Sequence, residues 1–248
     1  MHSSTDHPPV FHLTHWKAGS QWIRGLFMDT FGSRVVEPLV SDGHVTRGPI
    51  ERGLIYPTVY MPRGPFEAIP KPDDSVVFVV IRDLRDTVIS SYYSLLKSHP
   101  LVSPSGDPHP GVAEARRDLE ARSLEDGLIH LIQDSLNQSA HIQASWMESD
   151  ARVYRFEDLI EDARGGFRSI LDHCRLAYDA DALTTALRNQ SFEHRTGRTR
   201  GTEDTSSHFR KGISGDWRSQ FSDKVKAAFK ERFGAHLIRT GYEHDLDW

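Results

Sequence analysis

The sequence predicts a three-layer α/β/α domain with a central parallel sheet of about five strands. Apolar runs alternate with helical patterns along the 248 residues, as expected where crossover helices join parallel strands. Ser75–Ile81 is a β-branched run without polar alternation, which indicates a central strand buried on both faces. The apolar run Val10–Thr14 leads through a turn with Lys17, Gly19 and Ser20 into a helical pattern.

The other elements follow from the same patterns. β-Branched and aromatic content predicts further strands at 34–39, 53–61 and 151–156. Helical spacing predicts helices after an Asp83 N-cap, over 123–148 as one helix or a broken one, and over 157–176, 179–189 and 222–237. Gly, Pro and Ser content predicts loops at 40–52 and 98–112. We expect a flexible tail over 1–9 and a segment that is mobile when empty over 194–215.

Composition and charge limit the classes of function. A chain of 248 residues with 38% hydrophobic content can bury one sizeable core, so a single domain over 1–248 is expected. Lys and Arg total 30 against 35 Asp and Glu, which gives no reason to expect nucleic-acid binding. The only cysteine, Cys174, cannot form an internal disulfide. Without a secretory signal or an apolar run long enough to span a membrane, we expect a soluble, cytoplasmic protein.

The turn after the first strand is a candidate anion site. The first N–H groups of a helix lack partners within it and carry the positive end of its dipole, so they bind phosphate or sulfate readily. Lys17 adds a mobile charge, although a solvated loop lysine is the alternative interpretation. Because Lys17 precedes Gly19 and no Gly-Lys-Ser/Thr occurs, the turn lacks the Walker pattern and a standard ATP or GTP site is disfavoured.

Three motifs in order resemble those of the cytosolic-type sulfotransferases. His15–Trp22, HWKAGSQW, is similar to that family's Pro-Lys-Ser-Gly-Thr-Thr-Trp loop, and Arg82–Ser90, RDLRDTVIS, resembles its second motif. Arg210-Lys211-Gly212, followed by Gly215-Asp216-Trp217, resembles its C-terminal Arg-Lys-Gly motif. The resemblance runs from about Val10 to Phe221. It implies a fold like that of the P-loop nucleoside triphosphate hydrolases.

The resemblance also implies a ligand, 3′-phosphoadenosine 5′-phosphosulfate (PAPS), and a set of residues that bind it. The first loop would hold the sulfated end, the second and third motifs the 3′-phosphate, and aromatic residues the adenine. Family membership implies no metal. The residues assigned to the donor are Lys17, Ala18, Gly19, Ser20, Gln21, Trp22, Arg82, Ser90, Phe156, Ser191, Phe192, Arg210, Lys211 and Gly212. Seen alone, the aromatic ones would more often be core residues.

The base that deprotonates the acceptor hydroxyl is the point of departure from the family. The family places a histidine in a Lys-Thr-His-Leu-Pro segment, whereas Thr58–Pro62 here reads TVYMP and puts Tyr60 at that position. With an ordinary pKa near 10, tyrosine needs a nearby cation such as Lys17 to act as a base, so Tyr60 either does so or orients the acceptor. His44 is the alternative base, followed by His15 and Glu67.

The function predicted is transfer of a sulfuryl group from PAPS, leaving 3′-phosphoadenosine 5′-phosphate (PAP), to a hydroxyl of a small-molecule, lipid or carbohydrate acceptor. Two alternatives are a nucleotide-binding module of the same fold without activity and a P-loop kinase. The acceptor pocket is expected in the loops 40–65 and 101–112, whose residues do not identify the acceptor. The family's dimer motif has no match around 218–227, which leaves the oligomeric state open.

Overall fold

The structure is a computed structural model that describes residues 6–37, 48–102, 108–109 and 111–248. The contacts within the chain divide it into two compact units. The first unit comprises Met1–Arg82 and Ser139–Arg195, and the second comprises Asp83–Gln138 and Thr196–Trp248. The prediction of a single domain is not tested by this division and stays a prediction.

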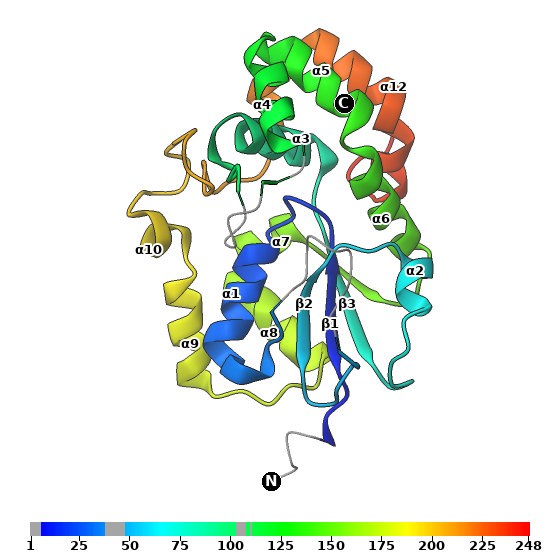
Figure 1. Cartoon of the computed structure of the whole chain (residues 1–248), viewed down its shortest axis with the longest axis vertical. Coiled ribbons are helices and arrows are strands. Elements are labelled where there is room, and N and C mark those ends of the chain that lie inside the picture. Colours follow the sequence, from blue (N-terminus) through cyan, green and yellow to red (C-terminus); the bar gives the residue numbers. More distant parts are fainter. Residues whose placement is uncertain (1–5, 38–47, 103–107, 110) are drawn as a thin grey trace. The chain divides into compact units, whose positions relative to one another are not determined.

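The first unit is built on a parallel sheet with the strand order β2-β1-β3-β4, of which Figure 1 labels β2, β1 and β3. The strands are β1 (Val10–Thr14), β2 (Ile55–Val59), β3 (Val76–Ile81) and β4 (Arg152–Arg155). The predicted parallel sheet is confirmed, and β3 is an interior strand as expected. The described residues form four strands rather than about five, because Val35 makes only an isolated bridge to Ile55.

Helices flank this sheet. The helical elements of the first unit are α1 (Ser20–Phe31), η2 (Gly32–Arg34), α2 (Arg63–Glu67), most of α6 (Asn137–Met147), α7 (Phe156–Glu161), α8 (Ala163–His173), α9 (Ala180–Asn189) and most of α10 (Phe192–Thr196). Helix α9 packs beside α1 (Figure 1). The helix predicted over 157–176 is divided, because Asp162 ends α7 and its carboxylate caps α8 by accepting a hydrogen bond from the Gly165 N–H.

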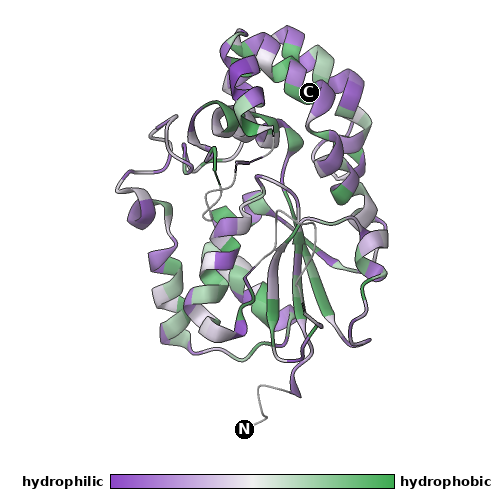
Figure 2. Cartoon of the chain, viewed as in Figure 1, coloured by the Kyte–Doolittle hydropathy of each residue, from purple (hydrophilic) through white to green (hydrophobic). Residues whose placement is uncertain are grey.

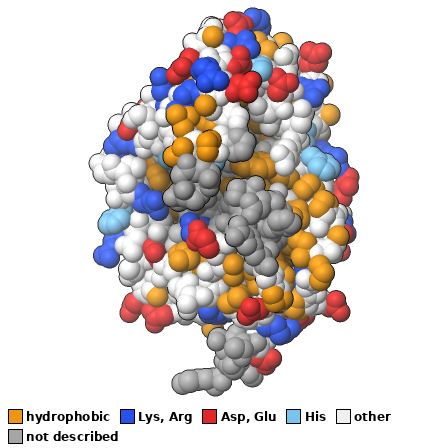
Figure 3. Space-filling view, in the orientation of Figure 1, with side chains coloured by type: hydrophobic (Ala, Val, Ile, Leu, Met, Phe, Trp, Pro, Cys, Tyr) orange, Lys and Arg blue, Asp and Glu red, His pale blue; other side chains and the backbone are white. Residues whose placement is uncertain are grey.

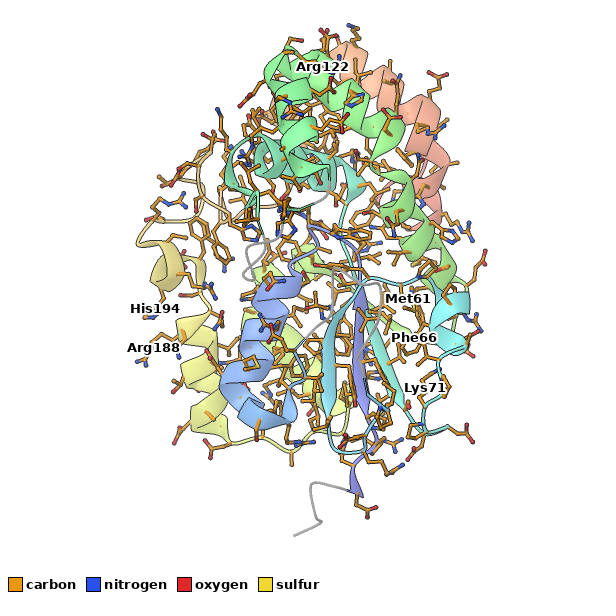
Figure 4. The ribbon with its side chains drawn as sticks, viewed as in Figure 1. Met61, Phe66, Lys71, Arg122, Arg188 and His194 are labelled. Carbon is orange, nitrogen blue, oxygen red and sulfur yellow. The ribbon has the colours of Figure 1, made fainter. Side chains whose placement is uncertain are left out.

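Apolar side chains pack against both faces of the sheet, whose strands contain the hydrophobic residues drawn in green in Figure 2. On one face Val10 and Phe78 pack with Phe27 of α1 and Phe167 of α8 in the main core. On the other face lies a second aromatic group, in which Phe66 of α2 contacts both the β1 ring of Phe11 and the α6 indole of Trp146. The Trp146 Nε1–H donates to the carbonyl of Met61, which Figure 4 labels beside Phe66.

The second unit is helical. Its elements are α3 (Leu84–Tyr93), η3 (Ser94–Ser98), α4 (Val112–Glu120), α5 (Leu124–Asp134), α11 (Trp217–Gln220) and α12 (Asp223–Arg239). The helix predicted over 123–148 is broken after Asp134, so that α5 packs on α12 within this unit. Helix α4 was not predicted, and the loop predicted over 98–112 ends where α4 begins. Side chains of both charges are interspersed over these helices on the face that Figure 3 shows.

Residues 6–9, which the sequence predicts to be part of a flexible tail, are hydrogen bonded. The Gly53 N–H donates to the His7 carbonyl at 2.7 Å, and the Val76 N–H donates to the Pro9 carbonyl at 2.9 Å. The predicted tail is therefore attached to the sheet along its described part. Within the described ranges, no helix is long and apolar enough to cross a membrane.

A buried histidine marks an irregularity between β1 and β2. The register of the two strands shifts between Phe11 and Leu13, opposite Thr58, whose φ of 62° is unusual for a β-branched residue. His12 stacks on Phe78 with ring centroids 4.9 Å apart, and its Nδ1 accepts from the Thr58 N–H at 3.4 Å. Burial lowers the pKa of His12 from 6.5 to about 3, so the imidazole is neutral in the fold.

The neutral His12 makes the fold sensitive to acid. The unfolded chain binds a proton at His12 below about pH 6.5 whereas the folded chain does not until about pH 3, so stability falls as the pH drops through this window. His12 should account for roughly 3 kcal/mol of lost unfolding free energy between pH 7 and pH 4. Urea unfolding of His12→Phe should show a correspondingly flatter pH dependence. The exposed His141→Phe is the control, and a wild-type slope in His12→Phe would contradict this account.

Candidate functional site

The turn between β1 and α1 contains two residues in the left-handed region of backbone conformation. Lys17 and Gly19 have φ values of 65° and 77°, and the Gly19 carbonyl accepts from Trp22 N–H at 3.0 Å to start the helix. The first turn of α1 contains no acidic residue, and no side chain caps its N-terminus. The positive end of this twelve-residue helix is therefore not neutralised by its own side chains.

Glycine is required at position 19 for two reasons. Its φ of 77° is strained for residues with a Cβ, and a Cβ placed there would lie 2.3 Å from the Phe156 ring. Phe156, the first residue of α7, thus packs directly against the turn. The aromatic residue assigned to the adenine and the loop assigned to the sulfated end lie side by side.

Arg82, directly after β3, joins the turn through its side chain. The Arg82 Nη1–H donates to the Lys17 carbonyl at 2.8 Å, and the guanidinium lies 4.9 Å from the centroid of the Phe156 ring. Burial, and then the positive charge of Arg82, lower the pKa of Lys17 from 10.5 to about 8. Two cations are held together here, an arrangement that a bound anion would stabilise.

Tyr60 lies at the same end of the sheet, just beyond β2. Its hydroxyl is 2.6 Å from the Ser20 Oγ, and its ring centroid is 4.8 Å from that of Trp16. Burial raises the pKa of Tyr60 above its ordinary value, and the hydrogen bonds from Ser20 and Gln21 only partly offset this. The phenol is therefore less acidic than a free tyrosine, contrary to what a catalytic base requires.

The other candidate bases differ in their surroundings. His44 lies outside the described residues. Glu67 accepts a hydrogen bond from the Arg63 Nε–H at 2.6 Å on the exposed side of α2. His15 is fully buried, and both of its ring nitrogens have backbone partners, the Trp16 carbonyl at 2.9 Å and the Arg82 N–H at 3.1 Å. His15 is thus part of the framework of the turn.

The aromatic residues assigned to the adenine have unequal exposure. Trp22 and Phe156 are both partly exposed and meet edge to face, with ring centroids 6.3 Å apart. Phe192 is buried, with 6% of its surface exposed, and the neighbouring Ser191 Oγ accepts from the His194 N–H. Trp22 and Phe156 have ring surface available for stacking, whereas Phe192 mainly packs in the protein.

The second unit carries the remaining predicted residues. Ser90 lies on α3, and Asp83 caps this helix as predicted, because its carboxylate accepts from the Arg85 N–H at 2.8 Å. Arg210 and Lys211 both form ion pairs with the Asp216 carboxylate, and the Arg210 guanidinium lies 4.5 Å from the centroid of the Tyr93 ring on α3.

Two charged residues of the second motif hold the third motif in place. The Asp86 carboxylate, 1% exposed, accepts from the Gly215 N–H at 2.6 Å and from the Trp217 N–H at 3.0 Å. The buried Arg85 guanidinium lies 3.9 Å from the centroid of Trp217 and pairs with Asp83. These contacts were not predicted from the sequence; the signal available was a charged pair, Arg85-Asp86, at the start of a helix that is otherwise uncharged.

Comparison with known proteins identifies the family. Residues 66–241 match the family described as Sulfotransferase domain. The chain belongs to this family. The match includes the second and third motifs, whereas the turn at Lys17 precedes it, so the assignment of the turn rests on its geometry and on the resemblance of its residues.

Solved sulfotransferase structures share the fold. Mouse sulfotransferase SULT7A1 complexed with PAP is 15% identical, with a TM-score of 0.57 over 93% of this chain and 84% of that chain. Retinol dehydratase is 15% identical in its complexes with androsterone and inactive cofactor PAP, and with retinol and PAP. The two complexes have TM-scores of 0.52 and 0.51. The alignments cover 94% and 93% of this chain and 82% of the retinol dehydratase chain in each case. A comparison with curated protein sequences yields no match.

Nothing in the described part of this sulfotransferase resembles a metal site. Among those residues, no group of three or more His, Cys, Asp or Glu side chains is placed to hold an ion. The charged groups near the predicted site are instead the cations Lys17 and Arg82 in the first unit and the ion-paired Arg210 and Lys211 in the second.

Asp86 gives a direct test of how the third motif is held. Asp86→Asn keeps the size of the side chain but replaces one acceptor oxygen by a donor that faces a backbone N–H. We expect a loss of roughly 1–3 kcal/mol in unfolding free energy by urea titration, the usual cost of an unpaired buried group. The exposed Asp150→Asn should unfold like the wild type. Equal midpoints for Asp86→Asn and Asp150→Asn would contradict the assigned role.

Proposed function

We propose that this sulfotransferase transfers the sulfuryl group of PAPS to a hydroxyl group of its acceptor. The observation that carries the proposal is the turn before α1, where Lys17 and Arg82 adjoin an uncapped helix N-terminus. The Arg82 Nε, although buried, has no hydrogen-bond partner among the described residues. A phosphate oxygen would satisfy this donor.

The resemblance to the family implies which residues bind the two anionic ends of the donor. Residues 17–22 of the turn would bind the sulfated 5′ end, with Trp22 and Phe156 offering ring faces for adenine. The 3′-phosphate would be bound by Arg82, Ser90 and the loop Arg210–Gly212, as the resemblance to the family implies. PAP in the SULT7A1 and retinol dehydratase structures supports the choice of donor for this chain.

Sulfuryl transfer resembles phosphoryl transfer in having a loose, in-line transition state, so the protein mainly positions reactants and stabilises charge. The sulfur–oxygen bond to the 5′-phosphate of PAPS breaks as a bond forms to the acceptor oxygen, whose proton passes to a base. Lys17 and the amides at the start of α1 would stabilise the charge that develops on the leaving 5′-phosphate.

Tyr60 is proposed to orient the acceptor. Its raised pKa argues against proton removal, whereas its hydroxyl, 2.6 Å from the Ser20 Oγ at the start of α1, lies where a hydrogen bond could align an alcohol. His44 stays the predicted alternative base. Retinol dehydratase is solved with retinol and with androsterone, both lipophilic alcohols, which supports hydroxyl-bearing small molecules or lipids as acceptors here; carbohydrates stay in the prediction.

Lys17→Ala tests the proposed activity. With radiolabelled PAPS and a panel of alcohols, the wild type should form sulfated products and PAP in equal amounts. Lys17→Ala should abolish transfer while PAP binding, measured by calorimetry, weakens only in part, because the 3′-phosphate and adenine contacts remain. The matched control is Lys226→Ala on the surface of α12, which should be fully active.

Two outcomes would contradict the proposal. Turnover of Lys17→Ala at the wild-type rate would exclude Lys17 from the reaction. Binding of PAP by the wild type without product from any acceptor would favour the alternative of a nucleotide-binding module that has lost activity.

A further inference from the structure

A buried histidine and a buried glutamine connect the turn at Lys17 to the end of β3. His15 and Gln143 are each 0% exposed, and they come from the turn and from α6. The His15 Nε2 lies 3.1 Å from the Arg82 N and 2.7 Å from the Gln143 Nε2. The Gln143 Nε2 also lies 2.7 Å from the Arg82 carbonyl oxygen. Both backbone polar groups of Arg82 therefore have a partner in this pair.

The backbone partners determine the tautomer of His15. The Trp16 carbonyl, 2.9 Å from the His15 Nδ1, can only accept, so Nδ1 carries the proton. The Arg82 N–H can only donate, so Nε2 is unprotonated and accepts. The Arg82 carbonyl likewise requires the amide N–H of Gln143. A proton on the His15 Nε2 would face two other N–H groups.

Arg82 is thus attached to the turn at both ends. Its backbone is held by His15 and Gln143, while its guanidinium donates to the Lys17 carbonyl at 2.8 Å. His15 is bonded to the Arg82 backbone, and the Arg82 side chain is bonded to Lys17, two residues after His15. The two hydrogen bonds and the chain from 15 to 17 therefore form a closed ring. The backbone and the guanidinium of Arg82 are therefore both bonded to the turn that carries Lys17.

We propose that His15 and Gln143 are a positioning pair that fixes Arg82 relative to Lys17, with His15 as the neutral Nδ1–H tautomer. The proposal rests on the function proposed above, in which Lys17 and Arg82 bind opposite ends of one donor. The pair itself touches no donor atom. It sets the position of Arg82 relative to the turn at Lys17. In an active site, a misplacement of about 1 Å can lower the reaction rate on the order of 10²-fold.

Two substitutions of His15 separate its two bonds. The side-chain nitrogen of His15→Asn can replace Nδ1 toward Trp16 but cannot reach Arg82, whereas the side-chain oxygen of His15→Gln can replace Nε2 as the acceptor for Arg82. We expect His15→Asn and Gln143→Met to weaken PAP binding by roughly tenfold to a hundredfold, the worth of one charge-assisted hydrogen bond to the displaced Arg82. His15→Gln should stay within roughly threefold of the wild type. Calorimetry with PAP measures these affinities.

A positional effect is distinguished from a general loss of stability by comparing PAP with AMP, which lacks the 3′-phosphate. If Arg82 is displaced, His15→Asn should lose most of the preference for PAP over AMP, which His15→Gln should keep. The matched control is His173→Asn, because the His173 Nε2–H donates to the Val77 carbonyl at the other end of β3, at 2.9 Å. Equal effects of His15→Asn and His15→Gln, or an unchanged preference in His15→Asn, would overturn the proposal.

The tautomer is tested without any ligand. Nitrogen-15 NMR of the histidine side chains at pH 7 should show His15, assigned by its loss in His15→Gln, with a protonated Nδ1 and an unprotonated Nε2. A protonated Nε2 on His15 would contradict the proposed hydrogen bonds from Arg82 and Gln143 to this nitrogen. If the wild type bound neither PAP nor PAPS, the proposed function would fail and the positioning role with it, while the NMR result would still show whether the hydrogen-bonded pair exists.

Discussion

The constraint on which the first unit depends is the placement of two positive charges at the carboxyl end of a parallel sheet. Lys17 and Arg82 repel each other and lose hydration there, which is why the pKa of Lys17 falls to about 8. The fold tolerates this because Arg82 is bonded to the turn and to its buried neighbours. Such an arrangement is costly in the absence of an anion and favourable in its presence, as expected of a binding site.

Charged residues of the second and third motifs hold their own segments of the second unit in place. Asp86 holds two amides of the Gly215–Trp217 segment, and Arg85 packs against Trp217. In the loop before it, the Arg198 guanidinium donates to three backbone carbonyls, including that of Arg210. The motifs that resemble the family's therefore combine two kinds of residue, those assigned to the donor and those that shape the segment around them.

Local patterns made much of the fold predictable. The apolar runs of β1 and β3 and the carboxylate of Asp83 are recognisable within a few residues, and the structure places β1, β3 and the α3 cap as predicted. Residues 34–39 have strand-like composition, but strand formation depends on a distant partner, and among the described residues 34–37 only Val35 bridges to Ile55. Helix α4 was missed, although its Ala, Glu and Arg content favours a helix.

The contacts of the candidate site that were not predicted join residues far apart in the sequence. Gln143 lies 128 residues from His15, and no sequence pattern indicates that the two side chains meet. The close approach of Phe156 to Gly19 is similarly invisible in the sequence. The interpretation of Tyr60 as a base assumed that a nearby cation would lower its pKa, whereas burial raises it in the fold. Burial and long-range pairing are the properties that sequence reasoning could not supply.

The central claim is that the two cations of the first unit belong to a site for a nucleotide with a sulfated 5′ end and a 3′-phosphate. Calorimetric titration of the wild-type protein with PAP, AMP and ATP tests it most directly. We expect PAP to bind without added metal. AMP should bind at least roughly tenfold more weakly, because one charge-assisted contact is worth about 1.5–3 kcal/mol. Arg82→Ala should remove most of this difference between PAP and AMP. Tighter binding of ATP than of PAP, or equal binding of AMP and PAP, would contradict it.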